Sequence, residues 1–112
     1  MNVYDAAHQL ARALSECTEY KEFNKIQEDL KKDPQAEKML KDLREKQFEL
    51  YSLKAAGKPT EEAEKNLENL YNIISYNSLV SKYLEAEQRL AVILADVQRI
   101  IAKAVNIDQE AL

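Results

Sequence analysis

The sequence predicts an all-α fold, an elongated helical bundle of about five helices with a long amphipathic third and fifth helix. There is one Gly and there are two Pro in 112 residues, whereas a sandwich or barrel needs a turn signal about every ten residues. Glu, Lys, Leu and Ala dominate the composition, as they do in long helices. At this length we expect a single domain over residues 1–112, with the last few residues frayed.

The first helix is predicted over residues 3–16, and a second helix follows a break at Ser15 and Thr18 and runs to about Lys32. Asn2 is a good N-cap for the first helix, and Ser15 with Thr18 favours a break because both are poor interior residues. Apolar residues recur at spacings of three and four, which defines one helical face. They are Tyr4, Ala7, Leu10, Ala11 and Leu14 in the first helix, and Tyr20, Phe23, Ile26 and Leu30 in the second.

The third helix is predicted from Pro34 to about Ala56. Asp33 suits the N-cap, and Pro34 suits the first helical position, where its missing N–H costs nothing. Gly57 fits the left-handed position after the helix, and Pro59 prevents its continuation. A heptad rhythm with two polar members runs along this segment, with Met39, Phe48 and Tyr51 beside it: Ala36, Leu40, Leu43, Gln47, Leu50 and Lys54.

The fourth helix is predicted to begin after Thr60 as its cap, with acidic residues in the first turn, where the helix dipole favours them. Its apolar face consists of Leu67, Leu70, Ile73 and Ile74. Tyr76-Asn77-Ser78 predicts the next break, with Asn77 or Ser78 as the cap.

The fifth helix, over about residues 78–105, carries the strongest helical signal. Its first apolar row alternates spacings of four and three without interruption. A second row lies beside the first: Val80, Leu84, Ala91, Leu94, Ile101 and Val105. A helix of this length extends about 40 Å, longer than a compact globule of this size. We therefore expect a homo-oligomer, a dimer or larger, to cover the remaining stripe.

The oligomer interface is predicted to draw on the first apolar row of the fifth helix, namely Leu79, Tyr83, Ala86, Leu90, Ile93, Val97 and Ile100. Two alternatives stay open. The third helix could provide the interface instead, or the stripe could be internal core throughout. Tyr51, Tyr71 and Tyr76 are further interface candidates, because tyrosine is enriched at protein–protein interfaces.

The residues that usually carry chemistry are scarce. His8 is the only histidine and Cys17 the only cysteine, so neither a disulfide nor a cysteine cluster can form within one chain. Paired acids such as Glu61 and Glu62 fall on polar faces, and one Gly cannot build a phosphate-binding loop. We predict a protein that is not an enzyme and has no catalytic residue, metal or cofactor, with Cys17 acting as a small hydrophobic residue.

The charge pattern and the N-terminal segment limit the partners. The net charge is −4, and acidic and basic residues alternate without the basic stripe of a nucleic-acid binder. We predict no direct nucleic-acid binding. No apolar run approaches the roughly twenty residues of a membrane span, and residues 1–5 do not begin a signal peptide. The prediction is a cytoplasmic protein without membrane contact.

Two segments resemble the YlbF/YmcA/YheA family of Firmicutes, and the YheA-like branch most. They are residues 2–7 with Leu10 and Leu14, and the run from Asn77 through Tyr83 and residues 87–90 to Ile100 and Ile101. Residues 20–23 and the Asp33-Pro34 break also fit. The resemblance implies an all-helical cytosolic oligomer. YlbF and YmcA belong to a complex that regulates RNA processing, and through it competence, sporulation and biofilm formation. Their iron–sulfur clusters are held by cysteines that this chain lacks, so neither the cluster nor the complex is carried over.

The leading functional hypothesis is a non-catalytic interaction or regulatory protein that self-associates through amphipathic helices and can bind a protein partner. An accessory factor in RNA processing and decay, which would bind a nuclease rather than RNA, is the alternative implied by the resemblance. An enzyme is a third hypothesis, and it would require an active site shared across an oligomer interface.

Overall fold

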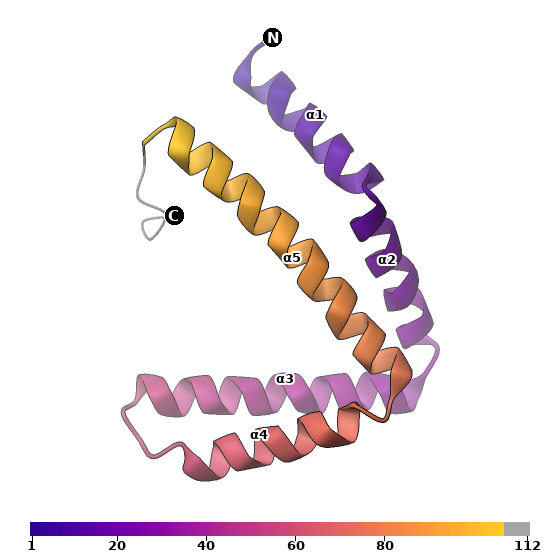
Figure 1. Cartoon of the computed structure of the whole chain (residues 1–112), viewed down its shortest axis with the longest axis vertical. Coiled ribbons are helices and arrows are strands. Elements are labelled where there is room, and N and C mark those ends of the chain that lie inside the picture. The colour runs from indigo at the N-terminus through magenta and orange to yellow at the C-terminus, as the bar shows by residue number, and fades with distance from the viewer. Residues whose placement is uncertain (107–112) are drawn as a thin grey trace. The chain divides into compact units, whose positions relative to one another are not determined.

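The computed structural model describes residues 1–106, and within them the chain forms five α-helices and no strand. The described residues are 86% helical, so the all-α prediction with about five helices is confirmed. The expected fraying of the last few residues concerns a segment outside the described residues. The helices, shown in Figure 1, are α1 (Val3–Glu16), α2 (Thr18–Lys31), α3 (Pro34–Ala55), α4 (Glu61–Ile74) and α5 (Ser78–Ala104).

Three helices begin at side-chain caps that the sequence predicts. Asn2 Oδ1 accepts a hydrogen bond from the backbone N–H of Asp5 at 2.9 Å. Asp33 Oδ1 accepts one from Ala36 N at 3.1 Å, and Asn77 Oδ1 accepts one from Val80 N at 3.0 Å. Each bond satisfies one of the backbone donors that lack a partner in the first helical turn. Of the two caps considered for α5, Asn77 is the one used.

Two of the remaining helix boundaries differ slightly from the prediction, and the end of α3 agrees with it. Cys17 alone separates the first two helices, and its backbone N–H donates to the Leu14 carbonyl, so Thr18 is already helical. Thr60 occupies the N-cap position of α4 without a capping bond, and its hydroxyl donates to Glu64 Oε1 instead. Gly57 has a φ of 69°, the left-handed conformation that favours glycine after a helix.

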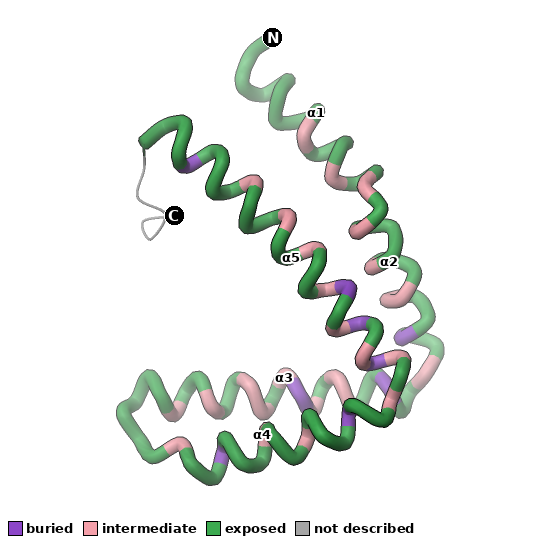
Figure 2. Tube along the Cα trace, viewed as in Figure 1, coloured by how far each residue is buried: buried purple, intermediate pink, exposed green. Residues whose placement is uncertain are grey.

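The chain separates into two compact units. The central unit is Ile26–Tyr83, and the terminal unit is Met1–Lys25 together with the chain from Leu84 onward. In the central unit, α3 and α4 form an antiparallel pair (Figure 1). The buried side chains of the central unit, purple in Figure 2, are Leu30, Ala36, Leu43, Ala63, Ile74, Val80 and Tyr83.

The packing of α3 against α4 includes one polar contact. It is made by Gln47, which interrupts the apolar heptad row of α3. Gln47 Nε2 donates a hydrogen bond to the Tyr71 hydroxyl of α4 at 2.8 Å. The polar residue that weakens the apolar row in the sequence is therefore a contact between the two helices.

The terminal unit contains α1, the first part of α2 and most of α5. Arg89 Nη2 of α5 lies 3.7 Å from Glu22 Oε2 of α2, and both side chains are about half exposed. An ion pair with that much solvent contact contributes little, about 0–1 kcal/mol. No residue of α1 is buried, so the apolar face of this helix stays largely uncovered (Figure 2).

Candidate functional site

The predicted interface row on α5 changes from buried to exposed along the helix. Tyr83 and Ala86 are only 8% and 1% exposed, so they are already covered within the chain. Leu79, Leu90, Ile93 and Val97 are half-buried, and Ile100 is 68% exposed. The C-terminal part of the row is therefore the part with most surface left for another chain. That this row forms an oligomer interface is still a prediction.

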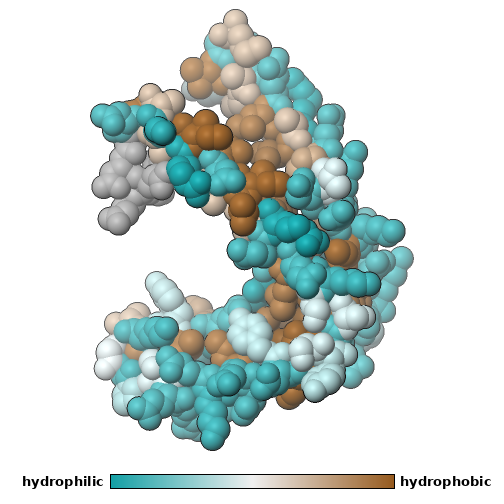
Figure 3. Space-filling model, in the orientation of Figure 1, coloured by the Kyte–Doolittle hydropathy of each residue, from teal (hydrophilic) through white to brown (hydrophobic). Residues whose placement is uncertain are grey.

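The second apolar row of α5 adds to the exposed surface at the same end of the helix. Val80 at its start is fully buried, whereas the row is exposed from Ala91 onward. The large apolar side chains exposed on this part of α5 are Val92, Leu94, Ile100, Ile101 and Val105. Figure 3 shows apolar side chains, in brown, gathered on the face of the terminal unit that this view presents.

The apolar face of α1, predicted from the sequence, is largely exposed, and no residue of this helix is buried. Leu10 and Leu14 are half-buried, and Tyr4, Ala7 and Ala11 are exposed. Val3 and Tyr4 are 80% and 78% exposed at the start of the helix. An amphipathic helix usually buries such a face, so the α1 face is a second candidate surface for another protein.

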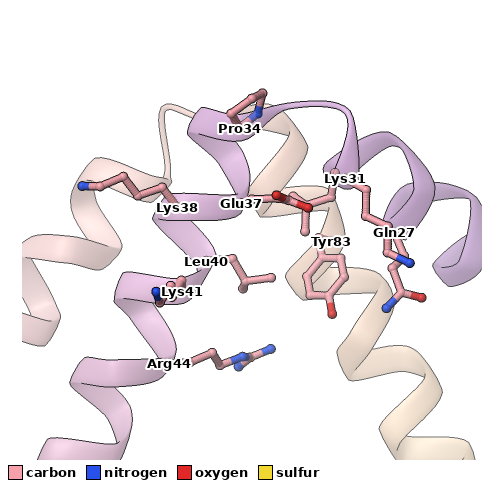
Figure 4. Close-up of a pocket in the computed structure, with 10 residues that line it drawn as sticks. Gln27, Lys31, Pro34, Glu37, Lys38, Leu40, Lys41, Arg44 and Tyr83 are labelled. Atoms are coloured by element: carbon pink, nitrogen blue, oxygen red, sulfur yellow. The ribbon is translucent and has the colours of Figure 1, made fainter.

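A groove in the central unit is a third candidate, and the sequence did not reveal it. It measures about 690 Å³ and is lined from α2, α3 and the first turns of α5, as Figure 4 shows. Glu37, Leu40 and Arg44 project from α3 towards Tyr83 (Figure 4). The lining residues are Gln27, Leu30, Lys31, Pro34, Glu37, Lys38, Leu40, Lys41, Arg44 and Tyr83.

Two different faces of α3 explain how this groove arises. On one face, Ala36 and Leu43 are fully buried. A neighbouring stripe with heptad spacing carries Glu37, Lys41, Arg44, Phe48 and Tyr51. Its first three members line the groove, and Phe48 and Tyr51 are each 70% exposed. The spacing of this stripe was the only signal in the sequence that could have indicated the groove.

The other tyrosines considered as interface residues lie on α4 and just after it. Tyr71 is partly exposed and accepts the hydrogen bond from Gln47, and Tyr76 is almost fully exposed. No contact with another chain tests either residue, so both stay predictions.

The residues that could take part in catalysis or metal binding lie apart from one another. His8 is exposed on α1, and Cys17 is a half-buried free cysteine between α1 and α2. Within residues 1–106, no group of three or more His, Cys, Asp or Glu side chains is arranged to hold a metal ion. In the same range, no helix has the length and apolar character needed to cross a membrane.

The bacterial proteins that are more than 40% identical to this chain include two UPF0342 proteins. A UPF0342 protein of Symbiobacterium thermophilum is 45% identical over 107 residues, which cover 95% of this chain and 96% of the relative. A UPF0342 protein of Clostridium tetani is 44% identical over 109 residues, which cover 96% and 94%. The similarity therefore extends over nearly the whole length of both chains.

Two solved structures share the fold. A protein of unknown function (DUF964) from Bacillus stearothermophilus superposes with a TM-score of 0.81 and 20% identity, and the match covers 93% of this chain and 92% of that one. Bacillus subtilis RicA, solved in complex with RicF, matches with a TM-score of 0.63 and 20% identity, over 93% of each chain. At this identity the two structures establish a common fold.

The family model for control of the competence regulator ComK, YlbF/YmcA, matches residues 3–106. That range includes all five helices of the described chain. It also agrees with the resemblance read from the first helix and from the run after Asn77, whereas the YheA-like branch is still a prediction. By this match and by its close relatives, the chain belongs to the YlbF/YmcA family.

Proposed function

We propose that this protein is a non-catalytic helical module that self-associates, as a dimer or larger, and binds a protein partner in a regulatory role. The observation that carries the proposal is α1. This helix has 14 residues and an apolar face, and none of its residues is buried. A helix of about this length is marginal in water without packing, so a stable α1 favours a second chain that covers its face.

The exposed end of α5 supports the same proposal. Ile100, Ile101 and Val105 are all more than half exposed. Covering a large apolar side chain contributes about 1.5–3 kcal/mol, so joining several such residues across an interface offsets part of the entropic cost of association. Surfaces on α1 and α5 together provide more apolar area than either helix alone.

Family membership supports the regulatory part of the proposal. The family description concerns control of the competence regulator ComK, and RicA, which shares the fold, was solved in complex with RicF. By analogy, we propose that a protein partner, rather than a substrate, is what this chain recognises. A second candidate favoured by family membership is an accessory role in RNA processing and decay, in which the partner would be a nuclease.

Sedimentation equilibrium of the purified protein at micromolar concentration tests self-association. We expect a mass at least twice the 12.9 kDa of the chain. A single species of 12.9 kDa across the concentration range would show that the exposed faces do not join two copies. Co-purification from a Gram-positive lysate, followed by identification of the bound proteins, then separates a nuclease partner from other regulatory partners.

A further inference from the structure

The groove of the central unit differs in charge from the rest of the chain. Four of its lining residues are basic (Lys31, Lys38, Lys41 and Arg44), and only Glu37 is acidic. The whole chain, in contrast, has a net charge of −4. The lining of the groove is thus locally basic in an acidic chain, and this electrostatic arrangement favours an acidic partner.

Two of these cations are not neutralised by any residue that the structure describes. Lys38 Nζ lies 3.7 Å from Asp42 Oδ2, which partly compensates its charge. Lys31 and Lys41 are exposed, and neither has an ion-pair partner among residues 1–106. Lys31 comes from the end of α2 and Lys41 from α3, so the unpaired charges belong to two helices.

Apolar side chains accompany the basic ones in the groove. Leu30 and Tyr83 are buried, Leu40 is half-buried, and Pro34 completes the apolar part of the lining. The combination of an apolar surface with basic side chains is complementary to an amphipathic segment whose polar face is acidic.

Beyond the groove, the same face of α3 carries two exposed aromatic residues. Phe48 and Tyr51 follow Lys41 and Arg44 at heptad spacing on one face of the helix. From Glu37 to Tyr51 this stripe extends about 21 Å at 1.5 Å per residue. A small molecule would occupy only part of that length, whereas a partner helix of about four turns matches it.

We infer that the groove lined by Lys31, Leu40 and Lys41, extended by Phe48 and Tyr51, binds one amphipathic, acidic helix of a partner protein. The inference rests on the proposed function, since it specifies the chemistry of the protein partner. The apolar residues of the partner helix contact Leu40, Phe48 and Tyr51, and its carboxylates pair with the two lysines.

A protein helix fits the groove better than RNA does. Bases bind proteins without sequence preference by stacking on accessible aromatic rings, but the aromatic ring inside the groove, Tyr83, is only 8% exposed. Exposed Phe48 and Tyr51 lie beyond the basic part of the groove, in the direction in which a helix of several turns would extend.

A displayed library of 18-residue peptides tests the inference directly. The peptides keep apolar residues at helical spacing and vary all other positions, and they are selected on the full-length protein. We expect the enriched peptides to be acidic and helical. Their affinity should fall about tenfold or more for the double variant Lys31→Glu with Lys41→Glu, and by a similar factor for Phe48→Ala with Tyr51→Ala.

The matched control is the double variant Lys65→Glu with Lys103→Glu, which changes the net charge equally at exposed positions outside the groove. It should bind the selected peptides as the unmodified protein does. Circular dichroism verifies that every variant is folded. Enrichment of basic or uncharged peptides, or equal binding by all variants, would overturn the inference.

Two further measurements distinguish other occupants. Binding of a fluorescent oligouridine that is tighter than peptide binding and lost with Lys31→Glu and Lys41→Glu would assign the groove to RNA. A lower sedimenting mass for the same double variant would assign it to a second copy of this chain. That second outcome overturns the inference and leaves self-association intact. A monomeric protein that binds acidic peptides refutes self-association and supports the groove.

Discussion

Asp33 is the residue at which sequence and structure agree most closely. Asp-Pro at a helix start predicts both a side-chain cap and a proline in the first turn, and Asp33 Oδ1 accepts the Ala36 N–H at 3.1 Å. Ala36 is itself fully buried, so the cap fixes the backbone where α3 enters the core of the central unit. The local sequence suffices here because all the atoms involved lie within four residues.

Replacing this cap should destabilise the protein measurably. Asp33→Ala removes the side-chain acceptor of the Ala36 N–H, and the free energy of unfolding should fall by about 1 kcal/mol, within a range of roughly 0.5–2. Urea denaturation followed by circular dichroism measures the change.

Asp42→Ala is the matched control for Asp33→Ala. It removes a half-exposed carboxylate whose ion pair with Lys38 spans one helical turn, and such pairs contribute a few tenths of a kcal/mol. A loss for Asp33→Ala no greater than that of Asp42→Ala would contradict the role given to the cap.

At the scale of one helix, α5 shows what hydrophobic periodicity predicts and what it leaves open. The apolar row from Leu79 to Ile100 is present on one face, but its first part is buried within the chain and its last part is exposed. Periodicity identifies the face that avoids water. It does not say whether that face is covered by the same chain or by another, because both kinds of packing use the same spacing.

Substitutions at both ends of the row test the predicted interface. Ile100→Glu introduces a charge where the side chain is 68% exposed in the single chain. If the row joins two copies, that charge becomes buried at a cost of several kcal/mol unless it is paired. We expect Ile100→Glu to stay helical and to dissociate, as measured by circular dichroism and sedimentation.

Leu90→Glu, at a half-buried position, provides the comparison along the same row. It should dissociate the oligomer if the row is an intermolecular seam, and unfold the chain if the row is internal core. Gln98→Glu is the control, since it places the same charge at an exposed polar position of α5. Folded variants that keep the mass of the unmodified protein would exclude this row as the interface.

In α3, too, periodicity identifies a face of the helix but not the residues that this face contacts. Its heptad row predicts one helix-packing seam that Gln47 and Lys54 weaken, yet Gln47 donates a hydrogen bond to Tyr71 across the α3–α4 pair. The sequence also shows Phe48 and Tyr51 beside that row. Lys41 and Arg44 lie on the same helix as these aromatic residues, whereas Lys31 of α2 and Tyr83 of α5 join the groove from other parts of the chain.

For the whole molecule, self-association should make stability depend on protein concentration. A chain that covers the α1 face only in an oligomer is stabilised by mass action. A hundredfold dilution should then lower the free energy of unfolding of a dimer by about 2.7 kcal/mol, and the melting temperature should fall with it. Thermal denaturation followed by circular dichroism across that concentration range makes the measurement. A melting temperature independent of concentration would indicate that one chain is stable by itself.

The sequence by itself determined the helices of this protein, three of their caps and the apolar face of each one. These features are local, because a capping bond spans three residues and a helical face repeats every three or four. Only the tertiary structure decided which parts of those faces are covered: Tyr83 and Ala86 are buried, whereas Ile100 is exposed. It alone also brought Lys31, Arg44 and Tyr83 to one groove. The physical reason is that burial depends on contacts between residues far apart in the chain, and no local period encodes which helices meet.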